Sequence, residues 1–111
     1  SGIVVSNHGG RVLDHCPATA EVLPDIVDAV GGKMTIFVDG AIRSGMDMFK
    51  ALALGADAVL IGRPFVTTVY GGGEEGVQLY VQKLKAELAD TMRMCGAHSL
   101  AEIKRSMLFG F

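Results

Sequence analysis

Three short apolar runs, each followed by a glycine-marked turn and then a helical pattern, constrain this sequence most. The runs are Gly2 to Val5, Thr35 to Val38 and Ala58 to Ile61. Ile3-Val4-Val5 is β-branched and unbroken, which is typical of a strand buried on both faces. Single strands that alternate with helices predict an α/β fold with a parallel sheet. Because three strands leave two unpaired edges, we expect a segment of a larger barrel or pairing with a second copy.

Helix start and stop signals occupy the segments between the runs. Pro17-Ala18-Thr19 opens a first helix, in which Pro24 should separate a short turn from the main segment, and Gly31-Gly32 ends it. Ser44 is a suitable N-cap for a second helix, and Gly55 should stop that helix.

The last third of the chain is predicted to be mostly helical. A helical segment up to Tyr70 precedes a flexible Gly71-Gly72-Gly73, and a long amphipathic helix should run from Glu74 to near Gly96. Ser99-Leu100-Ala101-Glu102 matches a capping box for a final short helix. The methionines, Met94 included, are expected to fill the core. The predicted apolar face of the long helix comprises Val77, Tyr80, Val81, Leu84, Leu88, Met92 and Cys95.

Composition excludes several classes of protein. With 111 residues, 50% hydrophobic content and a mean hydropathy of +0.38, one domain with a sizeable core is expected. A net charge of −2 and a pI near 5.8 leave no electrostatic footprint for nucleic acid. The stretch from Ala51 to Leu60 is broken by Gly55 and Asp57, so we expect no membrane span. No secretory signal is visible.

The two cysteines carry no metal-ligand or redox spacing. Cys16 and Cys95 are far from any C-x-x-C pattern, so we expect free thiols in a reducing cytosol, a cytoplasmic protein and no metal site.

The turn after the first run places a titratable base near a fixed cation. His8 and Arg11 lie within Ser6-Asn7-His8-Gly9-Gly10-Arg11, at the expected carboxyl end of a strand. In α/β proteins ligands bind at that end. His8 could take a proton while Arg11 grips a carboxylate through its two-nitrogen fork. On its own, the segment is also typical of a tight turn without chemistry.

Two further turns are suited to an anion. Val38 to Gly45 ends the second strand and begins a helix, so its N–H groups and helix dipole can face a phosphate, and Arg43 adds a cation. Gly62-Arg63 repeats this chemistry after the third strand. Taken alone, Arg43 is more typical of a surface arginine that caps a turn, and Arg63 of a salt-bridged loop residue. Their repetition in two consecutive turns favours one phosphate site. Asp39 could hold a hydroxyl of the same ligand, orient Arg43 or cap the turn.

Taken together, these residues resemble the FMN-dependent α-hydroxy-acid oxidase and dehydrogenase family over essentially the whole chain. The matching segments are Ser6 to Arg11, Leu13-Asp14 with Pro17-Ala18-Thr19, Phe37 to Gly40 with Arg43, Phe49 to Ala56, Ile61 to Pro64 and Glu102-Ile103-Lys104. The resemblance implies that residues 1–111 are the last three βα units of a TIM (β/α)8 barrel plus C-terminal helices, incomplete as a barrel on their own.

The same resemblance implies oxidation of a small L-2-hydroxy acid, of the lactate or glycolate type, to the 2-oxo acid. His8 would be the catalytic base and Arg11 would bind the substrate carboxylate. Ser6 and His8 would contact the flavin. The FMN ribityl phosphate would be held by Asp39, Gly40, Arg43, Gly62 and Arg63.

The chain departs from the family pattern in two respects. Ala41 stands where a second glycine is common. The family's tyrosine pair, the carboxylate that orients the histidine and the lysine beside the flavin have no counterpart in these 111 residues. We therefore expect the rest of the barrel or a second copy as a partner, in a homo-oligomer. The alternatives are a non-catalytic partial barrel that self-associates and binds phosphate or FMN weakly, or a different FMN-barrel reaction.

Overall fold

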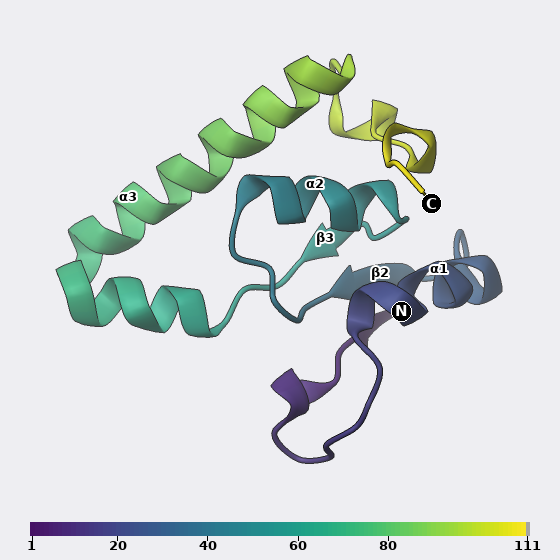
Figure 1. The fold of residues 1–111 in the computed structure, drawn as a ribbon, viewed down its shortest axis with the longest axis horizontal. Helices are drawn as coiled ribbons and strands as arrows, with labels where there is room; N and C mark the ends of the chain where they lie inside the picture. The colour runs from purple at the N-terminus through teal and green to yellow at the C-terminus, as the bar shows by residue number, and fades with distance from the viewer. Residues whose placement is uncertain (111) are drawn as a thin grey trace.

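The computed structural model describes residues 1–110 and shows a mixed α/β fold with a parallel sheet, as predicted (Figure 1). The strands lie in the order β1-β2-β3, and Val5, Val38 and Val59 are in register. The sheet consists of β1 (Gly2–Val5), β2 (Thr35–Val38) and β3 (Ala58–Val59). The third strand is shorter than expected, because the chain turns away after the Leu60 N–H donates to the Val38 carbonyl at 2.9 Å.

One face of the sheet is covered by the two crossover helices, α1 (Thr19–Val30) and α2 (Gly45–Ala53). The buried residues between them are Val5, Leu23, Ile36, Val38, Ala51, Leu54 and Ala56. On the sheet's other face Val4 is 47% exposed, so the prediction that the first strand is buried on both faces was wrong. The described helices simply leave this face open.

The first helix is continuous through Pro24, against the prediction that this proline would divide it. Pro24 is the sixth residue of α1, so its missing N–H leaves only the Ala20 carbonyl without a helical donor. Ala20 is exposed, and water can satisfy that carbonyl. Gly31 ends α1 as the C-cap, and Ser44 caps α2 through the N–H of Asp47, both as predicted.

The last helix, α3 (Arg63–Cys95), consists of two limbs that meet at Gly73 and form a V (Figure 1). Gly73 has φ 57° and ψ −141°, whereas Gly71 and Gly72 continue the first limb, so the helix is broken at one glycine rather than three. A Cβ on Gly76 would lie 2.4 Å from the Thr68 carbonyl oxygen. The two limbs therefore approach each other closely beside the bend.

A second buried cluster joins α2 to the second limb of α3 and to the C-terminal turns, and comprises Phe49, Ala53, Ala97 and Ile103. Gly96, at φ 79°, ends α3 as predicted. The predicted apolar face and core fillers are wrong in part, because Val81 is 47% exposed, Met94 is 88% exposed and Cys95 is also exposed.

The C-terminal turns are η2 (Leu100–Glu102) and η3 (Arg105–Met107), each a single 3-10 turn. The predicted capping box does not form. Ser99 makes no side-chain cap, and Glu102 accepts the N–H of His98 instead.

Cys16 and Cys95 are free thiols, as predicted. Within residues 1–110, no helix is long and apolar enough to cross a membrane, and no three metal-ligating side chains gather.

Candidate functional site

A cavity of about 670 Å³ lies at the carboxyl ends of the strands. It is bounded by the loops that follow β1, β2 and β3 and by α3. Its lining residues are His8, Gly9, Arg11, Asp39, Gly40, Ala41, Ile42, Arg43, Leu60, Ile61, Gly62, Arg63, Pro64, Thr67, Thr68 and Tyr80. The fold thus brings every predicted site residue except Ser6 to one cavity.

The loop after β1 is shaped by its own polar side chains. Ser6 Oγ accepts the His8 N–H at 3.1 Å, and Asn7 Oδ1 accepts the Gly9 N–H at 3.0 Å. His8 begins the 3-10 turn η1 (His8–Gly10) and has φ 56°, a left-handed conformation that histidine adopts more readily than most residues. Ser6 therefore supports the turn that presents His8, without lining the cavity itself.

Asn7 and Thr19 were not singled out from the sequence, yet both shape the site. Asn7 also donates from Nδ2 to the Pro17 carbonyl at 3.4 Å. Its position two residues before Gly9 is typical of an Asx turn, which was the available signal.

Thr19 is 5% exposed and donates from Oγ1 to the Asp39 carbonyl at 2.6 Å. A Cβ on Gly40 would lie 2.7 Å from the same hydroxyl. The start of α1 thus fixes the beginning of the turn after β2, and this close approach requires glycine at position 40.

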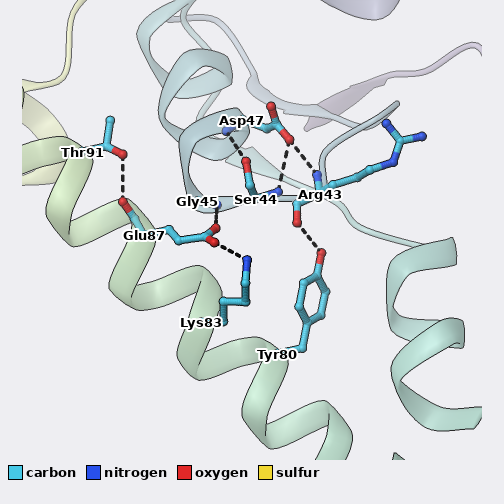
Figure 2. A network of polar contacts seen from close by, with 8 residues as sticks. All are labelled: Arg43, Ser44, Gly45, Asp47, Tyr80, Lys83, Glu87 and Thr91. Carbon is cyan, nitrogen blue, oxygen red and sulfur yellow. Dashed lines mark hydrogen bonds and ion pairs between the residues drawn. The ribbon is translucent and has the colours of Figure 1, made fainter. Parts of the chain in front are cut away.

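The N-terminus of α2 is already occupied by carboxylates (Figure 2). Asp47 Oδ2 accepts the N–H groups of Arg43 and Ser44 at 3.0 and 3.1 Å, and Glu87 Oε2 accepts the Gly45 N–H at 2.8 Å. The prediction that this helix end faces an anion is therefore wrong for these three amides. Two negative charges already complement the helix dipole there.

The amides nearer the strand remain available to a ligand. Within residues 1–110, the N–H groups of Gly40, Ala41 and Ile42 have no hydrogen-bond acceptor. Gly62, which precedes the α3 helix, has open space around its Cα. An anion at this turn would meet these amides and not the end of α2.

Side chains on the second limb of α3 form hydrogen bonds with the segment between β2 and α2 (Figure 2). Tyr80 donates from its hydroxyl to the Arg43 carbonyl at 2.8 Å, and Glu87 also pairs with Lys83. The hydrogen bond from Lys83, followed by that from the Gly45 N–H, lowers the pKa of Glu87 below its usual value. Burial raises the pKa of Tyr80 above its usual value.

The cavity has spare positive charge. Within residues 1–110, no carboxylate lies within 4 Å of the guanidinium groups of Arg11, Arg43 or Arg63. Asp39 Oδ1 is buried and has no hydrogen-bond partner among the described residues. Buried polar atoms are normally satisfied, so this oxygen indicates a missing donor. A ligand that combines an anionic group with hydroxyl groups satisfies both features.

The chain matches known proteins along nearly its whole length. The family model described as FMN-dependent dehydrogenase covers residues 1–109. L-lactate oxidase from Roseobacter sp. (strain GAI101) is 50% identical over 110 residues, and glycolate oxidase from Spinacia oleracea is 49% identical over 106 residues. These matches cover 99% and 96% of this chain but only 30% and 29% of the relatives.

The solved structures agree with this likeness. Mandelate oxidase with benzoyl-formic acid matches with a TM-score of 0.91 and 47% identity, over 94% of this chain and 31% of that one. The chain thus spans about 30% of the length of the curated relatives it matches. On the family model and these identities together, it belongs to the FMN-dependent dehydrogenase family.

Proposed function

We propose that this chain supplies the catalytic base, the substrate-carboxylate arginine and the phosphate site of an FMN-dependent enzyme that oxidises a small L-2-hydroxy acid to the 2-oxo acid. The observation that carries the proposal is the single cavity in which His8, Arg11, Asp39, Arg43 and Arg63 meet. The names of the relatives, L-lactate oxidase and glycolate oxidase, support substrates of the lactate or glycolate type.

The residues of the two later turns fit the tail of FMN. Arg43 and Arg63 would flank the phosphate, because both line the cavity and neither guanidinium group has a carboxylate partner in the part of the chain that the structure describes. Gly40 and Gly62 would allow the phosphate to approach the backbone. Asp39 Oδ1 would accept a ribityl hydroxyl, which would satisfy its unpartnered state.

The first turn would face the flavin and the substrate. Ser6 Oγ accepts one hydrogen bond and can still donate its own hydrogen toward the flavin. Arg11 would bind the substrate carboxylate with both terminal nitrogens and so fix the position of the α-carbon. His8 would accept a proton from the 2-hydroxy acid, a task suited to imidazole near neutral pH. FMN, when bound, would accept the two electrons of the oxidation.

We further propose that residues 1–111 are the last three βα units of a TIM barrel followed by C-terminal helices. The open face of the sheet, where Val4 is 47% and Leu60 43% exposed, would then be the barrel interior. The remaining strands would come from the same polypeptide or from a second copy in a homo-oligomer, and would cover both free edges of the sheet.

The test uses a hybrid oxidase, in which this chain replaces the matched 110-residue segment of the Roseobacter L-lactate oxidase. The hybrid should be yellow, and lactate or glycolate should bleach its flavin under anaerobic conditions. His8→Ala should abolish bleaching while FMN stays bound. His15→Ala is the matched control, because His15 is exposed and does not line the cavity. A flavin that is bound but not reduced by any of a panel of 2-hydroxy acids would refute the proposal.

The open sheet also favours a second candidate, a non-catalytic partial barrel. Two unpaired edges and an exposed apolar face, with Val4 and Leu60 on it, would drive self-association. Sedimentation of the 111-residue chain would then show an oligomer, and FMN titration would show weak binding. A monomer that binds FMN tightly would count against this candidate.

A further inference from the structure

We propose that Tyr80 is a positioning residue that ties the two arginine turns together and thereby raises the affinity of the cavity for a phosphate group. The inference rests on the proposed function, since it concerns the same phosphate site. It assigns a role to a residue of α3 that lies far along the chain from both turns.

Tyr80 contacts the turn after β2 directly and the start of α3 just after Arg63. Its hydroxyl donates to the Arg43 carbonyl at 2.8 Å, in the turn after β2. Its ring meets Phe65 edge-on, with 5.0 Å between centroids and 68° between ring planes. Phe65 lies two residues after Arg63, in the first turn of α3. Tyr80 also lines the cavity itself, so it bridges the two turns at the site.

The hydrogen bond from Tyr80 completes the anchoring of the Arg43 backbone. The Arg43 N–H donates to Asp47 Oδ2 at 3.0 Å, and its carbonyl accepts from Tyr80 (Figure 2). With both backbone groups held, only the side chain of Arg43 remains to be ordered when an anion binds. Ordering a binding group in advance lowers the entropic cost of binding.

A purely structural role for Tyr80 makes a different prediction from this positioning role. Loosening the packing of α3 would weaken the binding of any flavin, whether or not it carries a phosphate. A change confined to Arg43 and Arg63 would weaken FMN binding but leave riboflavin binding unchanged, because riboflavin lacks the phosphate. The ratio of the two dissociation constants therefore separates the two roles.

The experiment measures FMN and riboflavin binding by flavin fluorescence in the hybrid oxidase, which carries the full chain. Tyr80→Phe keeps the ring against Phe65 and removes only the hydrogen bond. We expect FMN affinity to fall about three- to tenfold, the usual effect of one neutral hydrogen bond, while riboflavin affinity stays the same. Tyr70→Phe is the matched control, because Tyr70 is 89% exposed and does not line the cavity.

Each outcome decides a separate point. If the unmodified hybrid binds riboflavin as tightly as FMN, the phosphate site and this inference both fail. If it prefers FMN but Tyr80→Phe leaves the ratio unchanged, the inference alone is overturned and the proposed function stands. Should the Tyr80→Phe protein not fold, Phe65→Leu removes the ring's other contact, and an unchanged ratio there also overturns the inference.

Discussion

The guanidinium of Arg63 lies against the backbone of Gly9. A Cβ built on Gly9 would stand 2.5 Å from Arg63 Nη2 and 3.4 Å from its Cζ. Gly9 follows His8 in the turn after β1, whereas Arg63 follows β3, so the outer two turns of the sheet meet at this point. The absence of a side chain at position 9 is what allows the cation to lie there.

Gly9→Ala should therefore weaken FMN binding by displacing Arg63. Gly10→Ala is the matched control, because Gly9 has φ 65° and Gly10 has φ 72°, yet a Cβ on Gly10 meets nothing within 4 Å. Each variant should lose about 0.5–1 kcal/mol of stability, because left-handed strain of about 1–2 kcal/mol is partly offset by the smaller backbone entropy that alanine loses on folding. Only Gly9→Ala should lower FMN affinity, by about tenfold, because displacing Arg63 disturbs its charged hydrogen bond to the FMN phosphate. Equal FMN affinities in the two variants, measured by fluorescence titration of the hybrid oxidase, would contradict this contact.

Gly45 should not tolerate even a methyl group. It is buried where α2 meets α3, and a Cβ there would lie 2.3 Å from the Leu88 nitrogen and 2.5 Å from the Leu84 oxygen. Both are backbone atoms and cannot move aside, so Gly45→Ala should cost about 1–3 kcal/mol or more. Gly72→Ala, in a helix with open space around it, should instead stabilise by about 0.5–1 kcal/mol. Urea unfolding of both variants gives the comparison.

Asp39 and Arg43 should affect flavins in different ways. Asp39→Ala removes the buried oxygen expected to accept a ribityl hydroxyl, so FMN and riboflavin should both bind about tenfold more weakly. Arg43→Gln should weaken FMN alone, because riboflavin has no phosphate. Titration of each variant with both flavins measures this pattern. An Asp39→Ala protein that loses affinity for FMN but not for riboflavin would show that Asp39 acts through the phosphate site, by orienting Arg43, and does not bind a ribityl hydroxyl.

Acid should loosen the junction between α2 and α3 through Glu87. The pKa of Glu87 is lowered in the folded chain by Lys83 and the Gly45 N–H, so its contribution to stability is complete above the ordinary value of 4.5. That contribution disappears as the pH falls through the lowered pKa. Glu87→Gln should flatten the dependence of the urea midpoint on pH between 7 and 3. Asp90→Asn, which removes an exposed ion pair with Arg93, should not flatten it.

The turn residues of the site could be predicted from the sequence because βα alternation fixes where they must lie. Parallel strands place their carboxyl ends at one edge, so His8, Arg43 and Arg63 had to meet once three strands were identified. The anchors on α3 could not be predicted in this way. Tyr80 is 37 residues from Arg43, and Glu87 is 42 residues from Gly45. Helical periodicity shows that a face is apolar but does not show which element it contacts.

The same limit explains the errors in burial and at the end of α2. Val4 lies in an unbroken β-branched run that is typical of a strand buried on both faces. Its burial nevertheless depends on whether another element covers the open face of the sheet. Ser44 and Asp47 indicate a capped helix, and their side chains occupy the amides at the start of α2 that were predicted to face an anion. A capping signal and an anion-site signal thus overlap at one turn, and only the hydrogen bonds separate them.

Ala41 holds a left-handed conformation, with φ 59°, in the turn that would face the phosphate. A side chain in this region costs about 1–2 kcal/mol, whereas glycine adopts it freely but loses about 0.5–1 kcal/mol more backbone entropy on folding. Ala41→Gly should therefore stabilise the chain by about 0.5–1 kcal/mol, which a urea midpoint would detect. Ala29→Gly is the control, because Ala29 lies exposed inside α1 and should lose about 1 kcal/mol. A loss of stability in Ala41→Gly of the size seen in Ala29→Gly would mean that Ala41 is unstrained, and that its methyl group contributes packing to the turn.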